Sequence, residues 1–254
     1  MSSRRAVRIG AVLLALMALA IPGWGAIDLG VSWSAEWNPV LSGGWGLFFT
    51  VLVAVPFGVV AIRPGGAAPS IWVLWVAVAA LALAAALGRE PELVVLVVWL
   101  AGGTACVALP SVAERWRPLE PDGGWVAALG AAAVSSPWLA YAWWMSANNR
   151  QGRSDTDVSS GVDHYSVQAA LGIAMVLLAV LATVWRRGRR QLGIHAGSCA
   201  IYLGILAYHW DGYPGAMSPF WAVLAFAWGL ALIAWAWAST RVHAFPSAPA
   251  DAST

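Results

Sequence analysis

Apolar residues form eight long runs, separated by short segments that are polar or rich in glycine and proline. A helix that crosses a bilayer needs about 20 mostly apolar residues, and each run is close to that length. The pattern therefore predicts an all-α, polytopic integral membrane bundle of about eight transmembrane helices. The runs are Val7–Ile27, Ser42–Ile62, Ser70–Gly88, Glu92–Val112, Gly123–Met145, Asp163–Trp185, Leu192–Trp210 and Met217–Ser239.

The two ends of the chain need separate interpretations. The first run follows several arginines and could be a cleaved signal peptide, but it is long enough to span a membrane. Pro22 and Trp24 also suit a cleavage site poorly, so we expect the run to be retained as a helix. The last residues, 242–254, are rich in Ala, Pro and Ser and are predicted to be a disordered tail.

Composition supports the membrane assignment and excludes several classes of protein. Hydrophobic residues make up 60% of the chain, charged residues only 10%, and the mean hydropathy is +0.71. A soluble domain carries about 25% charged residues, and disorder needs low hydrophobicity, so both are excluded. No basic face for nucleic acid is expected. All 14 basic residues are arginine, which excludes a retinal Schiff base and a catalytic lysine amine.

The arginines predict how the bundle is oriented. If the N-terminus lies inside, 11 arginines fall on the inner side and 3 on the outer side. Positive residues concentrate in cytoplasmic loops. We therefore expect a multipass protein of the cell membrane with its N- and C-termini in the cytoplasm.

A shift of 127 residues, half the chain length, suggests an internal duplication. Without gaps it aligns Asp28 with Asp155 and Glu36 with Asp163. The sequence predicts a parallel 4+4 repeat, with halves 1–127 and 128–241 related by an axis along the membrane normal. Chance similarity between apolar helices is the alternative.

Polar residues near the outer ends of two runs form the main candidate site. His164 and Gln168 are four residues apart and share a helix face. A glutamine inside a membrane helix usually faces the bundle interior, so His164 should turn inward too. His209 and Asp211 end another run on the same side, and Asp163 is a favoured helix N-cap. We expect these five residues to converge in one outer pocket; a hydrogen-bonded packing cluster is the alternative.

No metal site or cofactor is expected. The stretch Asp155-x-Asp157-x-Ser159 resembles the start of a calcium loop, in which alternate oxygens point at one ion. Glycine, however, comes one place late, at Gly161, and the twelfth position is Ser166, where glutamate is required.

One run is predicted to bend. Ser135-Ser136-Pro137 indicates a kink at which a serine hydroxyl bonds the carbonyl that proline leaves free. Such a kink would open space beside the outer cluster. Most of the 18 tryptophans lie near the ends of runs, as an interfacial belt, but Trp99 and Trp228 lie deeper and are expected to line a cavity.

Two main classes of function remain. No acid or arginine lies at mid-membrane to serve as an ion-coupling relay, and no Walker, HExxH or GxSxG motif occurs. The first class is a non-catalytic membrane subunit, sensor or binder of lipids or apolar ligands. Its partners would be the bilayer, a lipophilic small molecule or another membrane protein. A transporter of apolar small molecules is a third interpretation.

The second class is a membrane-embedded acid–base enzyme acting on a lipophilic substrate, for example an isoprenoid cyclase. Such chemistry needs a protonated carboxylic acid and aromatic faces that stabilise a cation. Glu36 or Asp163 would supply the proton, with His164 as a further catalytic candidate. The ligand-binding candidates are Gln168, His209 and Asp211, together with an aromatic wall of Trp138, Trp144, Tyr165 and Trp210.

Overall fold

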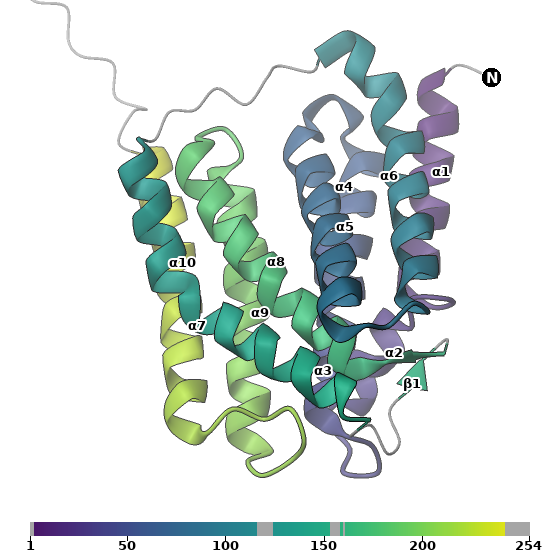
Figure 1. Cartoon of the computed structure of the whole chain (residues 1–254). Helices are drawn as coiled ribbons and strands as arrows, with labels where there is room; N and C mark the ends of the chain where they lie inside the picture. Colours follow the sequence, from purple (N-terminus) through teal and green to yellow (C-terminus); the bar gives the residue numbers. More distant parts are fainter. Residues whose placement is uncertain (1–2, 116–123, 153–157, 160, 242–254) are drawn as a thin grey trace, which may run out of the picture.

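The computed structural model describes residues 3–115, 124–152, 158–159 and 161–241. It is an all-α bundle, 82% helical, whose long helices run between two ends of the molecule (Figure 1). The first half contains α1 (Ser3–Leu19), α2 (Gly25–Val31), α3 (Pro39–Leu47), the π-helix η1 (Phe48–Ala54), α4 (Val55–Ile62), the short 3₁₀ turn η2 (Pro64–Gly66), α5 (Ala68–Gly88) and α6 (Leu93–Arg115). The second half contains α7 (Trp125–Arg150), α8 (His164–Val184), α9 (Arg189–His209) and α10 (Pro219–Arg241), with a small antiparallel ladder of β1 (Val158–Ser159) and β2 (Val162–Asp163).

Within the described residues, six helices are long and apolar enough to cross a membrane. They are the continuous helix Pro39–Ile62, formed by α3, η1 and α4, and the helices α5, α7, α8, α9 and α10 up to Ser239. α1 has 17 residues, and the apolar part of α6 covers Leu93–Ala108. The protein is therefore a bundle with six helices that could span a membrane, and the count of eight spans stays a prediction.

The first apolar run does not form one helix to Ile27, so its predicted end was wrong. α1 stops at Leu19, and the separate helix α2 begins at Gly25. Pro22 lies between them and has no backbone N–H to continue the helical hydrogen bonds. Trp24 then adopts a left-handed backbone, with φ of 52°, which redirects the chain into α2.

α8 is the central helix. In its apolar window 78% of the residues are buried, against 22% in α7 and in α10. Helices α3, α5, α7 and α9 pack against it, and α7 and α10 lie at one edge of the bundle (Figure 1). The two edge helices therefore present most of their surface to whatever surrounds the bundle.

α9 and α10 pack closely where a glycine of one helix faces a glycine of the other. A Cβ atom built on Gly197 would lie 2.7 Å from the carbonyl oxygen of Gly229, and one built on Gly229 would lie 2.5 Å from that of Gly197. Such distances leave no room for a side chain. Small residues allow membrane helices to pack backbone to backbone, and Gly193 and Gly197 have the four-residue spacing of that pattern.

The predicted repeat is not confirmed. The helices that would correspond do not begin at a constant spacing: Pro39 and His164 are 125 residues apart, and Ala68 and Arg189 are 121 apart. The 24-residue helix Pro39–Ile62 contains a π-helical segment and is longer than the 21-residue α8. Asp155 and the tail 242–254 lie outside the described residues.

Arginines and carboxylates lie mostly at opposite ends of the bundle. Ten of the twelve arginines in the described residues lie at or near the end where α1 begins and α10 finishes. Arg89 and Arg150 lie at the other end, together with most of the carboxylates. We call this second end the acidic end; it carries Asp28, Glu36, Glu90, Glu92, Asp163 and Asp211.

Candidate functional site

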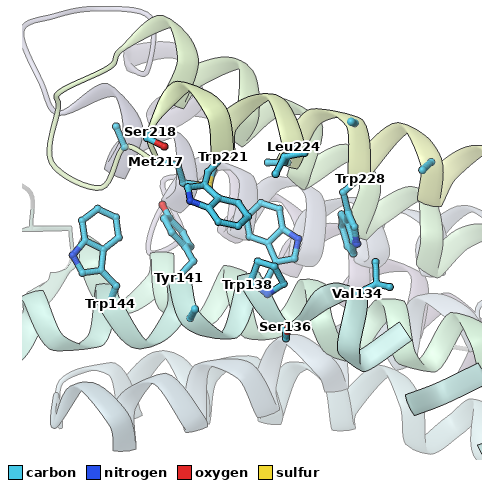
Figure 2. A pocket seen from close by; sticks show the side chains of 16 residues that line it. Val134, Ser136, Trp138, Tyr141, Trp144, Met217, Ser218, Trp221, Leu224 and Trp228 are labelled. Atoms are coloured by element: carbon cyan, nitrogen blue, oxygen red, sulfur yellow. The ribbon is translucent and has the colours of Figure 1, made fainter. Parts of the chain in front are cut away.

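A large apolar groove lies between α7 and α10. Its volume is about 890 Å³, within the range of roughly 300–1,000 Å³ for ligand sites. Aromatic side chains of both helices face each other across it, and the loop before α10 borders one end (Figure 2). We call it the α7–α10 groove; it is lined by Val134, Ser136, Pro137, Trp138, Ala140, Tyr141, Trp144, Ala216, Met217, Ser218, Trp221, Leu224, Ala225, Ala227, Trp228 and Ala231.

The predicted proline site of α7 lies beside this groove. Pro137 cannot donate to the carbonyl of Ala133, and the hydroxyl of Ser136 donates to that oxygen instead, at 2.8 Å. The sequence predicted this hydrogen bond, in which a serine hydroxyl pairs with the carbonyl that proline leaves free. α7 bends part-way along its length (Figure 1), and both Ser136 and Pro137 line the groove. The bend thus lies beside the groove, whereas the sequence placed the expected space beside the outer cluster, none of whose five residues lines the groove.

The aromatic wall contains part of the predicted set. Trp138 is buried and packs edge-to-face against Tyr141 and Trp228, with ring centroids 6.1 and 5.8 Å apart. Trp144 lies 6.0 Å from Tyr141. Trp138, Trp144 and the deep Trp228 therefore line one cavity.

The other two predicted wall residues lie elsewhere. Tyr165 is buried in α8, where its backbone N–H bonds Asp163, and Trp210 packs against Tyr213 at the end of α9. Neither is among the residues that line the groove.

A buried hydrogen-bond chain connects α8 to the groove. Gln168 is fully buried, as its position in an apolar helix predicted, and its Nε2 donates to the Tyr141 hydroxyl at 2.6 Å. That hydroxyl donates to the carbonyl of Gly215 at 2.8 Å, in the loop that ends at α10. Tyr141 was not among the predicted site residues, although its side chain joins the predicted glutamine to the groove.

The two histidines of the predicted pocket occupy different surroundings. His164 is buried, stacks on Trp45 with 4.7 Å between ring centroids, and its Nε2 lies 2.9 Å from Ser159 Oγ. His209 is exposed and lies against Trp33 and Trp210. Asp211 is exposed just beyond α9. Within the described residues no hydrogen bond or ring contact joins His164 to His209, so their shared site stays a prediction.

The carboxylates of the acidic end also differ in environment. Asp163 caps α8 as predicted, because its Oδ1 accepts the N–H of Tyr165 at 2.8 Å. Glu36 is exposed in the loop before α3. Glu90, which the sequence did not single out, is buried, and its Oε1 accepts the backbone N–H of Asp163 at 2.6 Å. Glu90 therefore ties the loop after α5 to the start of α8.

Burial raises the pKa of Glu90, and the nearby Ser166 hydroxyl and the backbone N–H of Asp163 partly oppose this. The charges of Asp163 and Glu92 add to the increase. Among the described residues, no group of three or more His, Cys, Asp or Glu side chains is arranged to hold a metal ion.

Comparisons with protein-family models, curated proteins and solved structures find no match for this chain.

Glu90→Gln is expected to change how stability depends on pH. A raised carboxyl pKa means that the folded state favours the protonated form, so its stabilising contribution is present at low pH and is lost as pH rises through the folded pKa. The substituted amide cannot ionise and keeps an acceptor for the Asp163 N–H. We expect the variant to melt a few degrees above the native protein at about pH 8 and equally at about pH 4.

Melting curves in detergent at several pH values test this expectation. Arg89 and Arg150 border the same region as Asp163, Glu92 and Glu90, so both proteins must be measured at constant ionic strength. A variant that loses stability at high pH would show that ionised Glu90 stabilises the fold.

Proposed function

We propose that the protein is a non-catalytic, multipass protein of the cell membrane that binds an apolar molecule, a lipid acyl chain or a molecule of similar shape, in the α7–α10 groove. One observation carries the proposal: a cavity of about 890 Å³ whose wall includes four tryptophans and a tyrosine. Ligand sites are typically concave and mostly apolar, with few polar groups.

The chemistry of the groove favours binding over the enzymatic alternative. Among its described lining residues there is no carboxyl group, and the polar side chains are those of serine, tyrosine and tryptophan. Acid-initiated cyclisation needs a protonated carboxylic acid beside the substrate. Glu36 and Asp163, the proposed donors, are not among the lining residues. The tryptophan faces would instead supply broad van der Waals contact for a chain, which is the interaction that drives association inside lipid.

Two hydroxyl groups of the wall are already hydrogen-bonded within the protein. The Tyr141 hydroxyl is engaged by Gln168 and Gly215, and the Ser136 hydroxyl by its own helix. Because these hydroxyl groups already have hydrogen-bond partners within the protein, a ligand does not need polar groups to pair with them. The groove is thus fitted to a molecule that is recognised by shape and apolar surface.

We further propose the finer topology of eight spans with both termini in the cytoplasm. α1 and α6 pack on the first half of the bundle, and both expose apolar side chains, such as Leu13 and Leu16 on α1 and Val95 and Val98 on α6. Such faces are suited to lipid. A reporter fused after Arg241 should be active only in the cytoplasm; activity on the other side would contradict this topology.

Photolabelling tests the binding proposal. The purified protein in detergent is irradiated with a palmitic acid analogue that carries a diazirine, and labelled peptides are mapped by mass spectrometry. We expect labelling of 134–144 and 221–231 that excess unlabelled palmitate suppresses. Ala227→Trp, which fills the groove, should reduce this competed labelling about tenfold, a change of about 1.4 kcal/mol.

Ala234→Trp is the matched control, because Ala234 is exposed on the same helix outside the groove lining. It should label like the native protein. Labelling that no competitor suppresses, or that both variants reduce equally, would contradict a specific site.

A further inference from the structure

The α7–α10 groove covers only the part of α10 that lies nearest the acidic end. Along this side its lining begins at Ser218 and ends at Ala231, whereas the helix continues to Arg241. At about 1.5 Å per residue, the stretch from Ser218 to Ala231 is roughly 20 Å long. A bilayer with its headgroup regions is about 40–45 Å thick. When α10 spans a membrane, the groove therefore has the depth of one leaflet, the one at the acidic end.

α7 diverges from α10 toward the acidic end. Val134, at one end of the groove, precedes the bend at Pro137, and Trp144, at the other end, follows it. Beyond the bend α7 runs away from α10 (Figure 1) and ends beside α5, where Asn149 donates to the carbonyl of Gly88. The groove is therefore wider at the acidic end than at the middle of the bundle.

The groove is also open along one side. Trp138 and Ala225 form a buried floor, whereas Trp144, Trp221 and Leu224 at the rim are exposed. α7 and α10 are the edge helices, and each buries only 22% of its apolar window. A lipid chain can therefore enter sideways from the bilayer while its headgroup stays in the polar region of the leaflet.

The two ends of the groove differ in polarity. The wide end carries the exposed Ser218 and Trp144, and tryptophan is the residue that collects at membrane interfaces. Asp211 is exposed in the same loop as Ser218. The narrow end is formed by the apolar side chains of Val134 and Ala231. A wide polar end and a narrow apolar end match the shape of an amphiphile, which has a broad headgroup and a thin chain.

We propose that the groove binds a membrane lipid of the leaflet at the acidic end, with its headgroup beside Trp144 and Ser218 and one acyl chain that extends to Val134 and Ala231. The inference rests on the proposed function and adds to it a ligand class and a direction of binding. A wholly apolar molecule has no headgroup to keep at the interface, so it would bind without a fixed direction. In the topology proposed above, the leaflet is the outer one.

Two palmitic acid probes test the direction of binding. One carries its diazirine beside the carboxyl group and the other at the methyl end. Each is irradiated with the full-length protein in detergent, with and without excess unlabelled palmitate. Competed labelling by the first probe should fall on 141–144 and 217–221, and competed labelling by the second on 134–138 and 224–231.

The outcomes separate this inference from the function on which it rests. Competed labelling of the same residues by both probes, or the reverse assignment, would overturn the direction while leaving a binding groove. Competed labelling by neither probe would contradict the proposed function, and the direction with it.

Ala231→Trp tests whether the chain reaches the narrow end. Ala231 is exposed, so the larger side chain fills the end of the groove without entering the core. A decanoic acid probe with its diazirine beside the carboxyl group reports how well unlabelled palmitate and decanoate compete. We expect the variant to weaken competition by palmitate about tenfold, as the loss of roughly two buried methylene groups would, and to leave competition by decanoate unchanged.

Ala234→Trp is again the matched control, because Ala234 is exposed on the same helix outside the lining; it should behave like the native protein toward both competitors. Unchanged competition by palmitate in Ala231→Trp would show that the chain does not extend to this end. Equal weakening of palmitate and decanoate would show that the headgroup is not held at the wide end. Either result would overturn the proposal.

Discussion

Replacing Gly197 by leucine is expected to separate α9 from α10 and to abolish the folded state in mild detergent. A Cβ atom at this position would lie 2.7 Å from a backbone carbonyl oxygen of α10, and backbone cannot move aside as a side-chain end can. Even Gly197→Ala should lower the free energy of unfolding by about 1–3 kcal/mol, the usual effect of overpacking.

Gly130→Ala is the control for this prediction. Gly130 lies in α7, and a Cβ atom there would meet nothing within 4 Å. Alanine is favoured over glycine in a helix by about 1 kcal/mol, so this variant should melt at or above the native temperature. Size-exclusion profiles and melting curves measure both effects; a monodisperse Gly197→Leu protein with native stability would contradict the close packing.

The second large effect is expected for Trp45→Ala. Trp45 is completely buried, its Nε1 donates to the Gly23 carbonyl at 2.6 Å, and its ring packs against His164 and Phe49. The side chain thus joins α3 to α8 and to the turn after α1. Truncation of a buried tryptophan to alanine costs about 3–5 kcal/mol, and we expect a loss of that size.

Two further substitutions separate packing from hydrogen bonding. Trp45→Phe keeps much of the ring contact but leaves the Gly23 carbonyl unpaired, which costs about 1–3 kcal/mol. Trp37→Ala, at an exposed tryptophan of the same end, should change stability by less than about 0.5 kcal/mol. Chemical unfolding in micelles gives these values, and equal losses for Trp45→Ala and Trp37→Ala would show that Trp45 does not hold the elements together.

The sequence predicted an all-α bundle, and six helices of the described residues are long and apolar enough to span a membrane, because about 20 apolar residues are what such a helix needs. It also predicted three features of polar side chains, because each depends on only a few neighbouring residues. These are the Asp163 cap, the burial of Gln168 and the Ser136 hydrogen bond at the proline. The break after Leu19 was missed because the residues around Pro22 are apolar enough to continue the run. The π-helical turn within Pro39–Ile62 has no signature in the apolar pattern.

The candidate site was predicted less well, because depth along a helix does not decide rotation about its axis. His164 and His209 were assigned to one site because both lie near the same end of the bundle. Their surroundings, however, depend on which face of α8 and of α9 is turned toward the neighbouring helices. Tyr141 and Glu90 acquire their roles from contacts with Gln168 and Asp163, which lie 27 and 73 residues away along the chain. No local pattern could indicate contacts of that kind.

The separation of arginines from carboxylates gives the bundle a permanent electrical polarity along its long axis. If the arginine-rich end lies in the cytoplasm, as proposed, a membrane potential that is negative inside favours this arrangement. Each elementary charge carried across the membrane field changes the energy by about 2.3 kcal/mol per 100 mV. Inverting the bundle would move ten arginine positions outward and most of the acids inward. The membrane potential opposes both movements. In the proposed topology, an energised membrane would therefore favour this one orientation, and collapse of the potential during biosynthesis should increase the fraction inserted upside down.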